Sequence, residues 1–367
     1  MRIVIFGLTI SSSWGNGHAT LWRGLCKHLV RLGHTIVFFE RDTPYYSGAR
    51  DLYELPGGQL KLFSDWESVR PVAKQYLRDA DVAIVTSYCP DAIAATDLIL
   101  AEGRAIPVFY DLDTPVTLSR IVAGEAVPYI GPRGLRDFDL VLSFTGGPGI
   151  SHEFRSRLGA RHIEPLYGHV DTDIHRPVAP QPHYRADLSY LGTYSDDRQR
   201  TLEALFVAPA RNRHDLRFLI GGAQYPDDFP WSPNIYFVRH LPPFEHAAFF
   251  ASSRLTLNVT RRAMAEMGWC PSGRLFEAAA CGVPLLSDSW AGLDTFFVPG
   301  DEILLAKNQD DTLAALAMSD AELQRIAQRG RERTMDQHTS DKRANELVAL
   351  LERAASGRRC QRQTEEA

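Results

Sequence analysis

The chain has 367 residues, of which 44% are hydrophobic and 23% are charged, and its formal net charge is −5. This length favours two globular domains. A weakly acidic chain whose basic runs are short and mixed with acids has no extended positive surface, so the composition argues against nucleic acid as a partner.

The cysteines are odd in number and show no spacing typical of a zinc site, so we expect reduced thiols at Cys26, Cys89, Cys270, Cys281 and Cys360. Residues 2–7 look like a buried strand rather than part of a secretory signal. No stretch approaches the roughly 20 apolar residues that cross a bilayer. We expect a soluble cytoplasmic protein that can still contact a membrane peripherally.

The first half alternates short apolar runs with amphipathic segments of helix length, which is typical of a parallel sheet with crossover helices. A strand over 2–7 leads into a polar loop, Leu8 to Gly17, and a helix from about His18 ends at Gly33. The remaining predicted strands are Thr35–Glu40, 81–86, 106–110 and 139–143, and the remaining predicted helices are 91–102 and 150–158.

The stretch Gly168–Pro182 contains three prolines and few core residues, which predicts a linker. The same alternation then restarts. It predicts strands at 187–192, 216–220, 235–238, 254–259, 284–287 and 302–305, and helices at 196–207, 243–252, 273–281, 310–318, 320–330 and 340–354.

This pattern predicts an α/β protein of two doubly wound, Rossmann-like domains that face each other across a cleft. The predicted parts are an N-terminal domain (1–168), a linker (169–185), a C-terminal domain (186–335), a helix that packs back toward the first domain (336–355) and a frayed polar tail (356–367). Ligands bind such sheets beyond the carboxyl ends of the strands.

The strongest local signal is Pro271 to Glu277. Ser272 is a good N-cap, and the free amides of Gly273, Arg274 and Leu275 at a helix start suit a diphosphate. Arg274 can add a bidentate contact, and Glu277, one turn into the helix, can accept hydrogen bonds from ribose hydroxyls. The alternative is an ordinary capped helix with no ligand.

This segment resembles the nucleotide-binding stretch of GT-B glycosyltransferases and, through Ser289–Gly300 and Glu302–Leu304, the spore-maturation CgeB-type group. The phrases His169–Pro177 and Gly192–Arg198 are similar to the linker and the second-domain start of GT-B enzymes. The resemblance implies that Glu277 holds the donor ribose and that a basic residue such as Arg198 reaches the diphosphate.

One position departs from the resemblance. Retaining members of the large related families carry a second glutamate eight residues before the ribose-binding one, and that position here is Trp269. Glu266 lies nearby but out of register. Neither a retaining outcome nor the role of that glutamate is therefore carried over.

The N-terminal loop is a second candidate site. Gly15, Asn16 and Gly17 form the acceptor-side loop, and His18 at the helix start is placed to deprotonate an acceptor hydroxyl. A purely capping histidine is the alternative. Glu40, at the end of the second strand, raises the further alternative of a dinucleotide site, although the glycines do not follow G-x-G-x-x-G.

Asp111 and Asp113 follow a predicted strand and superficially match the metal-binding D-x-D of GT-A enzymes. We interpret them as binding the acceptor or supporting a base, with stabilisation of the turn as the alternative. Arg261 and Arg262 follow another strand and can neutralise a leaving diphosphate, or form a solvated loop.

The residues together predict a metal-independent glycosyltransferase without a cofactor. It moves a sugar from a nucleotide-diphosphate donor, of UDP or GDP type, to a hydroxyl acceptor. The catalytic candidates are His18, Asp111 and Asp113, and the donor-binding candidates are Arg198, Arg261, Arg262, Ser272, Gly273, Arg274, Leu275 and Glu277. A nucleotide-sugar epimerase, a dinucleotide-dependent oxidoreductase and a non-catalytic binding module are the alternatives.

Overall fold

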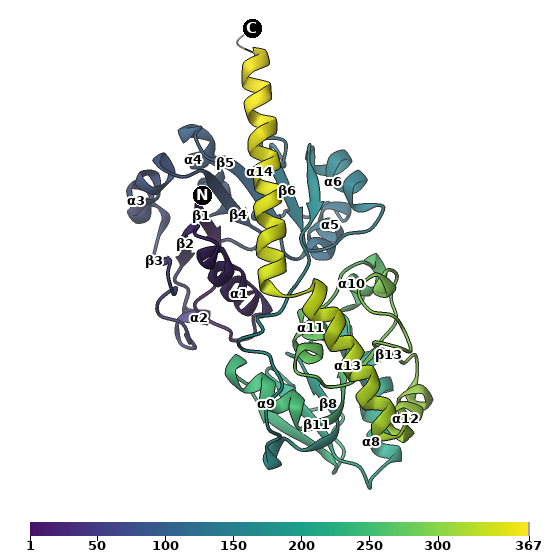
Figure 1. The fold of residues 1–367 in the computed structure, drawn as a ribbon. Coiled ribbons are helices and arrows are strands. Elements are labelled where there is room, and N and C mark those ends of the chain that lie inside the picture. The colour runs from purple at the N-terminus through teal and green to yellow at the C-terminus, as the bar shows by residue number, and fades with distance from the viewer. Residues whose placement is uncertain (366–367) are drawn as a thin grey trace. The chain divides into compact units, whose positions relative to one another are not determined.

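The computed structural model describes residues 1–365, with side chains to residue 358, in two units (Figure 1). Unit 1 combines Met1–Tyr167 with the segment that begins at Ser340, and unit 2 is Gly168–Thr339. Each unit is built around its own parallel sheet. Among the described residues, no helix combines the length and apolar character needed to cross a membrane.

Unit 1 contains a seven-stranded parallel sheet of order β3-β2-β1-β4-β5-β6-β7. The strands are β1 (Arg2–Gly7), β2 (Thr35–Arg41), β3 (Gln59–Phe63), β4 (Val82–Thr86), β5 (Ile106–Asp111), β6 (Leu140–Ser143) and β7 (Ile163–Pro165). The strand order reverses between β1 and β4. In doubly wound sheets ligands bind beside this reversal, so a ligand of unit 1 is expected at the loops after β1 and β4.

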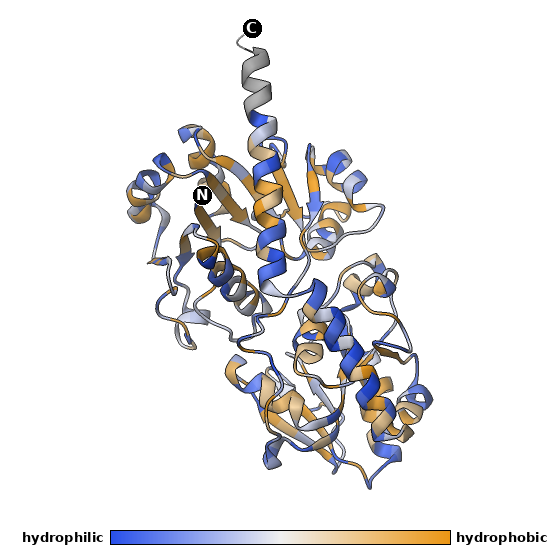
Figure 2. Ribbon diagram, in the orientation of Figure 1, coloured by the Kyte–Doolittle hydropathy of each residue, from blue (hydrophilic) through white to orange (hydrophobic). Residues whose placement is uncertain are grey.

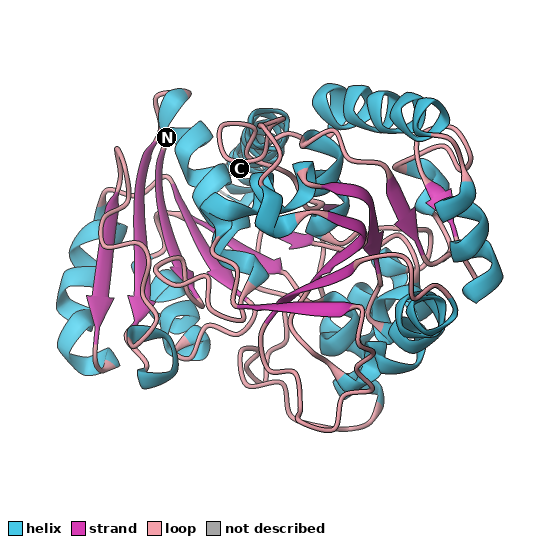
Figure 3. Ribbon diagram, turned by 90° about the horizontal axis from the view of Figure 1, so that it is seen from below, coloured by secondary structure: helices cyan, strands magenta, loops and turns pink. Residues whose placement is uncertain are grey.

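Helices flank the strands of each sheet (Figure 3). In unit 1 they are α1 (Gly17–Arg31), α2 (Pro44–Ser47), α3 (Trp66–Arg78), α4 (Ala92–Glu102), α5 (Thr114–Val122), α6 (Ile150–Leu158) and α14 (Ser340–Glu365). Because helices cover both faces of the sheet, its central strands are apolar on both sides (Figure 2). Val82 to Thr86, for example, are all buried.

Unit 2 contains a six-stranded parallel sheet of order β10-β9-β8-β11-β12-β13, with its reversal between β8 and β11. The strands are β8 (Ala186–Leu191), β9 (Phe218–Gly222), β10 (Ile235–Arg239), β11 (Ser253–Asn258), β12 (Leu285–Ser287) and β13 (Leu304–Leu305). The core between this sheet and its helices includes Leu188, Phe206, Phe218 and Leu257.

The α-helices of unit 2 are α7 (Asp196–Leu202), α8 (Ala208–Asn212), α9 (His246–Ala251), α10 (Arg262–Met267), α11 (Gly273–Ala280), α12 (Gln309–Ala317) and α13 (Asp320–Gln337). Short 3-10 turns are η1 (Pro182–Tyr184), η3 (Pro243–Glu245) and η4 (Leu293–Thr295). A π-helical segment, η2 (Glu203–Val207), joins α7 to α8. Pro209 lacks a backbone donor, which accounts for the locally widened helix before it.

Most of the predicted elements are confirmed, and the differences have local causes. Strand β3 and helix α3 were not predicted: β3 is an edge strand that alternates polar and apolar residues, and α3 contains Pro71. Helices α5 and α10 and strand β7 were also missed. The helix predicted over 320–330 continues to Gln337.

The prediction of a frayed tail from residue 356 is wrong for the described part of the chain. Helix α14 continues to Glu365 and packs against α1 within unit 1 (Figure 1). The guanidinium of Arg358 donates to the carbonyl oxygens of Gly103 and Ala105, which fixes this part of α14 on unit 1. Four cysteines, Cys26, Cys89, Cys270 and Cys281, are free thiols as predicted, and the side chain of Cys360 lies outside the described residues.

Candidate functional site

Helix α11 begins at the carboxyl edge of the unit 2 sheet, because it follows β11 in a crossover to β12. Ser272 is the N-cap, and its hydroxyl accepts from the backbone N–H of Arg274 at 3.3 Å. Gly273 has no atom within 4 Å of the position a Cβ would take, so the first turn is open on that side. Leu275 points into the core and anchors the helix start.

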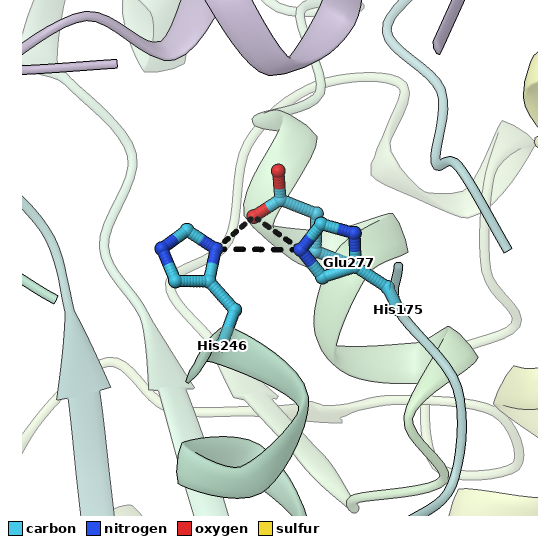
Figure 4. Close-up of side chains that lie close together, drawn as sticks. All are labelled: His175, His246 and Glu277. Atoms are coloured by element: carbon cyan, nitrogen blue, oxygen red, sulfur yellow. Dashed lines mark hydrogen bonds and ion pairs between the residues drawn. The ribbon is translucent and has the colours of Figure 1, made fainter. Parts of the chain in front are cut away.

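Glu277 lies one turn further along α11, with its side chain buried among polar groups. Its Oε2 pairs with the guanidinium of Arg274 and lies 3.9 Å from His175 Nε2 and 3.8 Å from His246 Nδ1. His175 Nε2 and His246 Nδ1 are 3.3 Å apart. Figure 4 shows the second carboxylate oxygen of Glu277 directed away from both imidazoles.

The charges in this cluster are set by burial and by Arg274. Burial opposes ionisation of Glu277, but the guanidinium outweighs it and, with the imidazoles, lowers the pKa of the carboxyl to about 2. Burial lowers the pKa of His175, and burial and Arg274 hold the pKa of His246 well below its usual value. At neutral pH the cluster therefore contains one carboxylate, one guanidinium and two neutral imidazoles.

Arginine side chains lie beside the strand reversal of unit 2. Arg261, three residues after the end of β11, donates to Asp197 at 3.1 Å, and Asp197 is on the helix that follows β8. This ion pair spans the two loops that flank the reversal. Arg198, the next residue, contacts the hydroxyl of Tyr190 and the carbonyl of Thr193, each at 3.3 Å.

Arg262 differs from its neighbour. Its side chain is 74% exposed and lies 4.0 Å from the equally exposed Glu266 on the same helix. A pair of this kind is held weakly, because solvent screens both charges. The structure therefore groups Arg261 and Arg198 at the strand reversal and leaves Arg262 in solvent.

Trp269 stands just before α11 in a left-handed backbone conformation with φ 44°, which is uncommon for a bulky residue. Its backbone N–H donates to Ala291 O at 2.7 Å. A Cβ on Gly292 would lie 2.4 Å from the indole ring, so glycine is needed there. The loop before α11 is thus fixed by Trp269, at the position where the resembling families have a glutamate.

In unit 1, the loop after β1 is organised by Glu40 at the end of β2. One carboxylate oxygen accepts from the backbone N–H groups of Ile10 and Ser11, and the other accepts from the hydroxyls of Thr9 and Ser11. Its side chain is buried and these bonds occupy both oxygens. Glu40 is therefore not presented to a ribose, which argues against the dinucleotide alternative.

The same loop ends at the start of α1. Gly15 has a positive φ of 58°, and Asn16 is the N-cap whose side chain accepts from the backbone N–H of His18. Gly17 is the first helical residue. The half-buried ring of His18 lies 6.5 Å from the ring of Tyr88, centre to centre. Tyr88 follows β4, so the two loops at the strand reversal of unit 1 meet here.

Asp113 joins this group. The carboxylate of Asp113 lies near the hydroxyl of Tyr88, and burial together with that carboxylate raises the pKa of Tyr88. Asp113 is almost fully buried, and it precedes α5 as its N-cap residue without a side-chain capping bond. His18, Tyr88 and Asp113 therefore lie in one neighbourhood at the carboxyl edge of the sheet.

Asp111 has a different position. Its side chain is fully buried at the end of β5, and Oδ1 accepts from the hydroxyl of Thr117 at 3.0 Å and from the N–H of Asp113 at 3.2 Å. Burial raises the pKa of Asp111 to about 7. A carboxyl group so placed supports the loop that carries Asp113.

Sequence reasoning missed His175, His246, Asp197 and Tyr88. His175 lies inside His169–Pro177, which we interpreted only as similar to the GT-B linker. His246 follows a Pro-Pro turn that matches no motif. The carboxylate that both histidines approach, Glu277, lies far from them along the chain. Their proximity depends on the return of α9 to the sheet edge, which no local pattern reveals.

Comparison with known proteins gives matches in fold and in family. The family model described as glycosyl transferase-like matches residues 198–349. No curated protein matches the sequence. Sucrose-phosphate synthase from Thermosynechococcus elongatus is 13% identical, with a TM-score of 0.69 over 97% of this chain and 99% of that chain.

Two further structures are similar to the same extent. An alpha-glucosyltransferase in complex with UDP-glucose and DNA is 11% identical, with a TM-score of 0.70 over 96% of this chain and 99% of that chain. HepE from Anabaena, in complex with UDP and glucose, is 13% identical, with a TM-score of 0.64 over 96% and 99%. The fold of this chain is therefore the GT-B architecture of these structures, and residues 198–349 resemble the glycosyl transferase-like family.

Proposed function

We propose that unit 2 binds a nucleotide-diphosphate sugar at the start of α11, with Glu277 as the ribose ligand. The observation that carries this proposal is a buried, ionised carboxylate one turn inside an open helix start. Burying a charge costs free energy unless the charge is paired and hydrogen-bonded. Buried ionised groups with a specific charged partner are therefore often found at functional sites. An ionised Glu277 accepts hydrogen bonds from ribose hydroxyls and donates none.

The diphosphate is assigned to the start of α11, at Gly273, Arg274 and Leu275. The sequence predicts three free amides there, but the N–H of Arg274 donates to the Ser272 hydroxyl at 3.3 Å and that of Leu275 to the Ser272 carbonyl at 3.1 Å, so a diphosphate would compete with these contacts. A helix start presents unpaired N–H groups and a partial positive charge to an anion. Arg261 and Arg198, beside the strand reversal of the same sheet, supply further positive charge for the departing diphosphate. These groups perform work that a metal ion does in other enzymes, so we propose a metal-independent transfer.

The acceptor is assigned to unit 1, where His18 is the proposed general base. The acceptor oxygen forms a bond to the anomeric carbon, the bond from that carbon to the diphosphate oxygen breaks, and the diphosphate leaves with the electron pair. The proton of the acceptor hydroxyl passes to the His18 imidazole. Asp113 and Tyr88 line the neighbourhood of His18, and Asp111 is a supporting residue.

The nucleotide is proposed to be of UDP or GDP type. UDP is the first choice, because HepE and the alpha-glucosyltransferase of similar fold were solved with UDP or UDP-glucose. Membership of the CgeB-like group remains a proposal that rests on the residues from Pro271 to Leu304. It would be supported by a donor preference shared with that group.

The experiment that tests the donor assignment is a thermal-shift screen of UDP-, GDP-, TDP- and ADP-sugars against the full chain. A ligand that binds only the folded protein stabilises it by about 2.7 kcal/mol at a hundredfold excess over Kd. We expect one nucleotide class to raise the melting temperature by a few degrees. Equal melting curves with all four classes at millimolar concentration would contradict the proposal.

The assignment of the base predicts that His18→Ala lowers turnover by roughly 10²–10⁴ while leaving donor affinity unchanged, since the imidazole acts on the acceptor. Steady-state rates and donor titrations measure the two quantities separately. The exposed His152 on α6 provides a matched control as His152→Ala. Full activity of the His18 variant would remove it from the mechanism.

A further inference from the structure

We propose that His246 is a positioning residue of the donor site, which holds Arg274 and Glu277 in the arrangement that receives the nucleotide. The inference rests on the proposed function and adds to it a residue that contacts neither the sugar nor the diphosphate. His246 is the first residue of α9, and α9 runs from β10 toward β11, so its start lies at the same carboxyl edge as the start of α11.

The contacts of His246 fix its tautomer. Its Nε2 lies 3.2 Å from the carbonyl oxygen of Leu241, which can only accept, so Nε2 carries the proton. Nδ1 then presents a lone pair, and the guanidinium of Arg274 lies 3.2 Å from it as a donor. A protonated His246 would direct an N–H at that guanidinium, which is unfavourable.

The consequence for Arg274 is that two acceptors from different helices hold one guanidinium. Glu277, on the same helix, accepts from it, and His246 accepts from the side of α9. Arg274 is only half-buried, so without the second acceptor its side chain would sample other rotamers. His246 thereby keeps the positive charge at the helix start, where we place the diphosphate.

His175 completes the arrangement from the segment before β8. Its Nε2 lies between His246 Nδ1 at 3.3 Å and Glu277 Oε2 at 3.9 Å. Both imidazoles approach the same carboxylate oxygen of Glu277, Oε2, while the other oxygen is directed away from them (Figure 4), and Arg274 also pairs with Oε2.

A bound metal ion is the alternative occupant, since His175, His246 and Glu277 offer ligand atoms within 4.8 Å of one another. Arg274 already occupies the position of the cation, because its guanidinium contacts both His246 and Glu277. With two neutral imidazoles, the guanidinium also balances the charge of the carboxylate. The geometry therefore favours arginine over a metal.

Two substitutions separate the two bonds of His246. In His246→Gln the amide nitrogen replaces Nε2 and keeps the bond to Leu241, but the acceptor for Arg274 is lost. In His246→Asn the amide oxygen replaces Nδ1 and keeps that acceptor. We expect the Gln variant to bind UDP about tenfold more weakly in titration calorimetry and the Asn variant to stay within about threefold of the unmodified protein.

A double-mutant cycle measures whether His246 affects UDP affinity through Arg274, which a purely structural role of His246 would not require. In an Arg274→Ala background, His246→Gln should cause no further loss of UDP affinity, because both act through the same guanidinium. The exposed His152, changed to Gln, is the control. If both His246 variants bind UDP normally while Glu277→Ala does not, the role of His246 is overturned and the donor site stands. Unchanged UDP binding by Glu277→Ala overturns the donor site itself.

One measurement needs no variant. Nitrogen NMR of the unmodified protein, with labelled histidine, should show His246 as a neutral imidazole protonated at Nε2 at pH 7. An imidazolium, or a proton on Nδ1, would contradict the proposal even if the variants fail to fold. If the purified protein contains stoichiometric zinc and His175→Ala loses it, the cation of the cluster is a metal rather than Arg274, and the proposal is overturned.

Discussion

Asp111 illustrates how a single buried carboxyl can couple the stability of unit 1 to pH. In the folded protein its pKa is raised to about 7 by burial, whereas an unfolded aspartate titrates near 3.9. Between these values the folded state binds the proton and the unfolded state does not. The contribution of protonated Asp111 to the free energy of unfolding is therefore complete below about pH 4 and is lost as the pH rises through about 7.

This titration predicts that the unmodified protein loses stability relative to Asp111→Asn as the pH rises from 4.5 to 8, by up to about 4 kcal/mol. Asparagine keeps the shape of the neutral acid but cannot ionise. Urea denaturation at several pH values measures the difference, and the exposed Asp97→Asn serves as the control. Parallel stability curves for the unmodified protein and Asp111→Asn would show that Asp111 is ionised when folded.

Residues differ in how far the sequence reveals them. Glu277 and Arg274 were predicted because helix capping and spacing place them on one turn. The sequence also predicts that Asp111 and Asp113 bind the acceptor, support a base or stabilise the turn, but it does not indicate which of the two is fully buried. His175 and His246 become partners of Glu277 only through packing of segments that are 71 residues apart, so no local pattern identifies them.

The loop after β1 shows how one strand can define the shape of a neighbouring element. Residues 9–11 have no regular structure, and Glu40 on β2 satisfies two of their backbone N–H groups and two hydroxyls. The loop in turn leads to Asn16 and the start of α1. The position of His18 therefore depends on a carboxylate in another element.

We expect Glu40→Gln to destabilise unit 1 by about 2–4 kcal/mol, because an amide group offers one acceptor and places its NH₂ against donors in a buried site. Chemical denaturation measures the loss, with the exposed Glu54→Gln as the matched control. The variant also tests the dinucleotide alternative through NADH titration. A normal denaturation midpoint would mean that the loop keeps its shape without the charge.

Element boundaries follow the strength of the local signal. Strands β4, β5 and β11 were predicted within two residues because each is a short apolar run bounded by polar residues. The start of α11 was predicted from Ser272 and its end from Gly282. The edge strand β3 and the short helices α5 and α10 lack such signals, since tertiary contacts rather than periodicity define them.

At the scale of the whole molecule, the chain builds two parallel sheets of the same kind and then returns to the first. Helix α14 belongs to unit 1 although it follows unit 2 in sequence, and Leu347 and Leu351 on it are fully buried. The alternation of strands and helices predicts two Rossmann-like sheets. It does not reveal the length of α14, because the residues after Ser356 are polar and their partners lie far away in sequence.

The central claim is that the ionised Glu277 holds the nucleotide in unit 2. Titration calorimetry of UDP and GDP against the full chain, Glu277→Gln, Glu277→Ala and the exposed control Glu332→Ala tests it most directly. We predict that both Glu277 variants lose about 1–3 kcal/mol of binding free energy for the nucleotide that the protein selects, through lost charge-assisted hydrogen bonds, while Glu332→Ala binds normally. Unchanged UDP and GDP affinity in folded Glu277 variants would contradict the account.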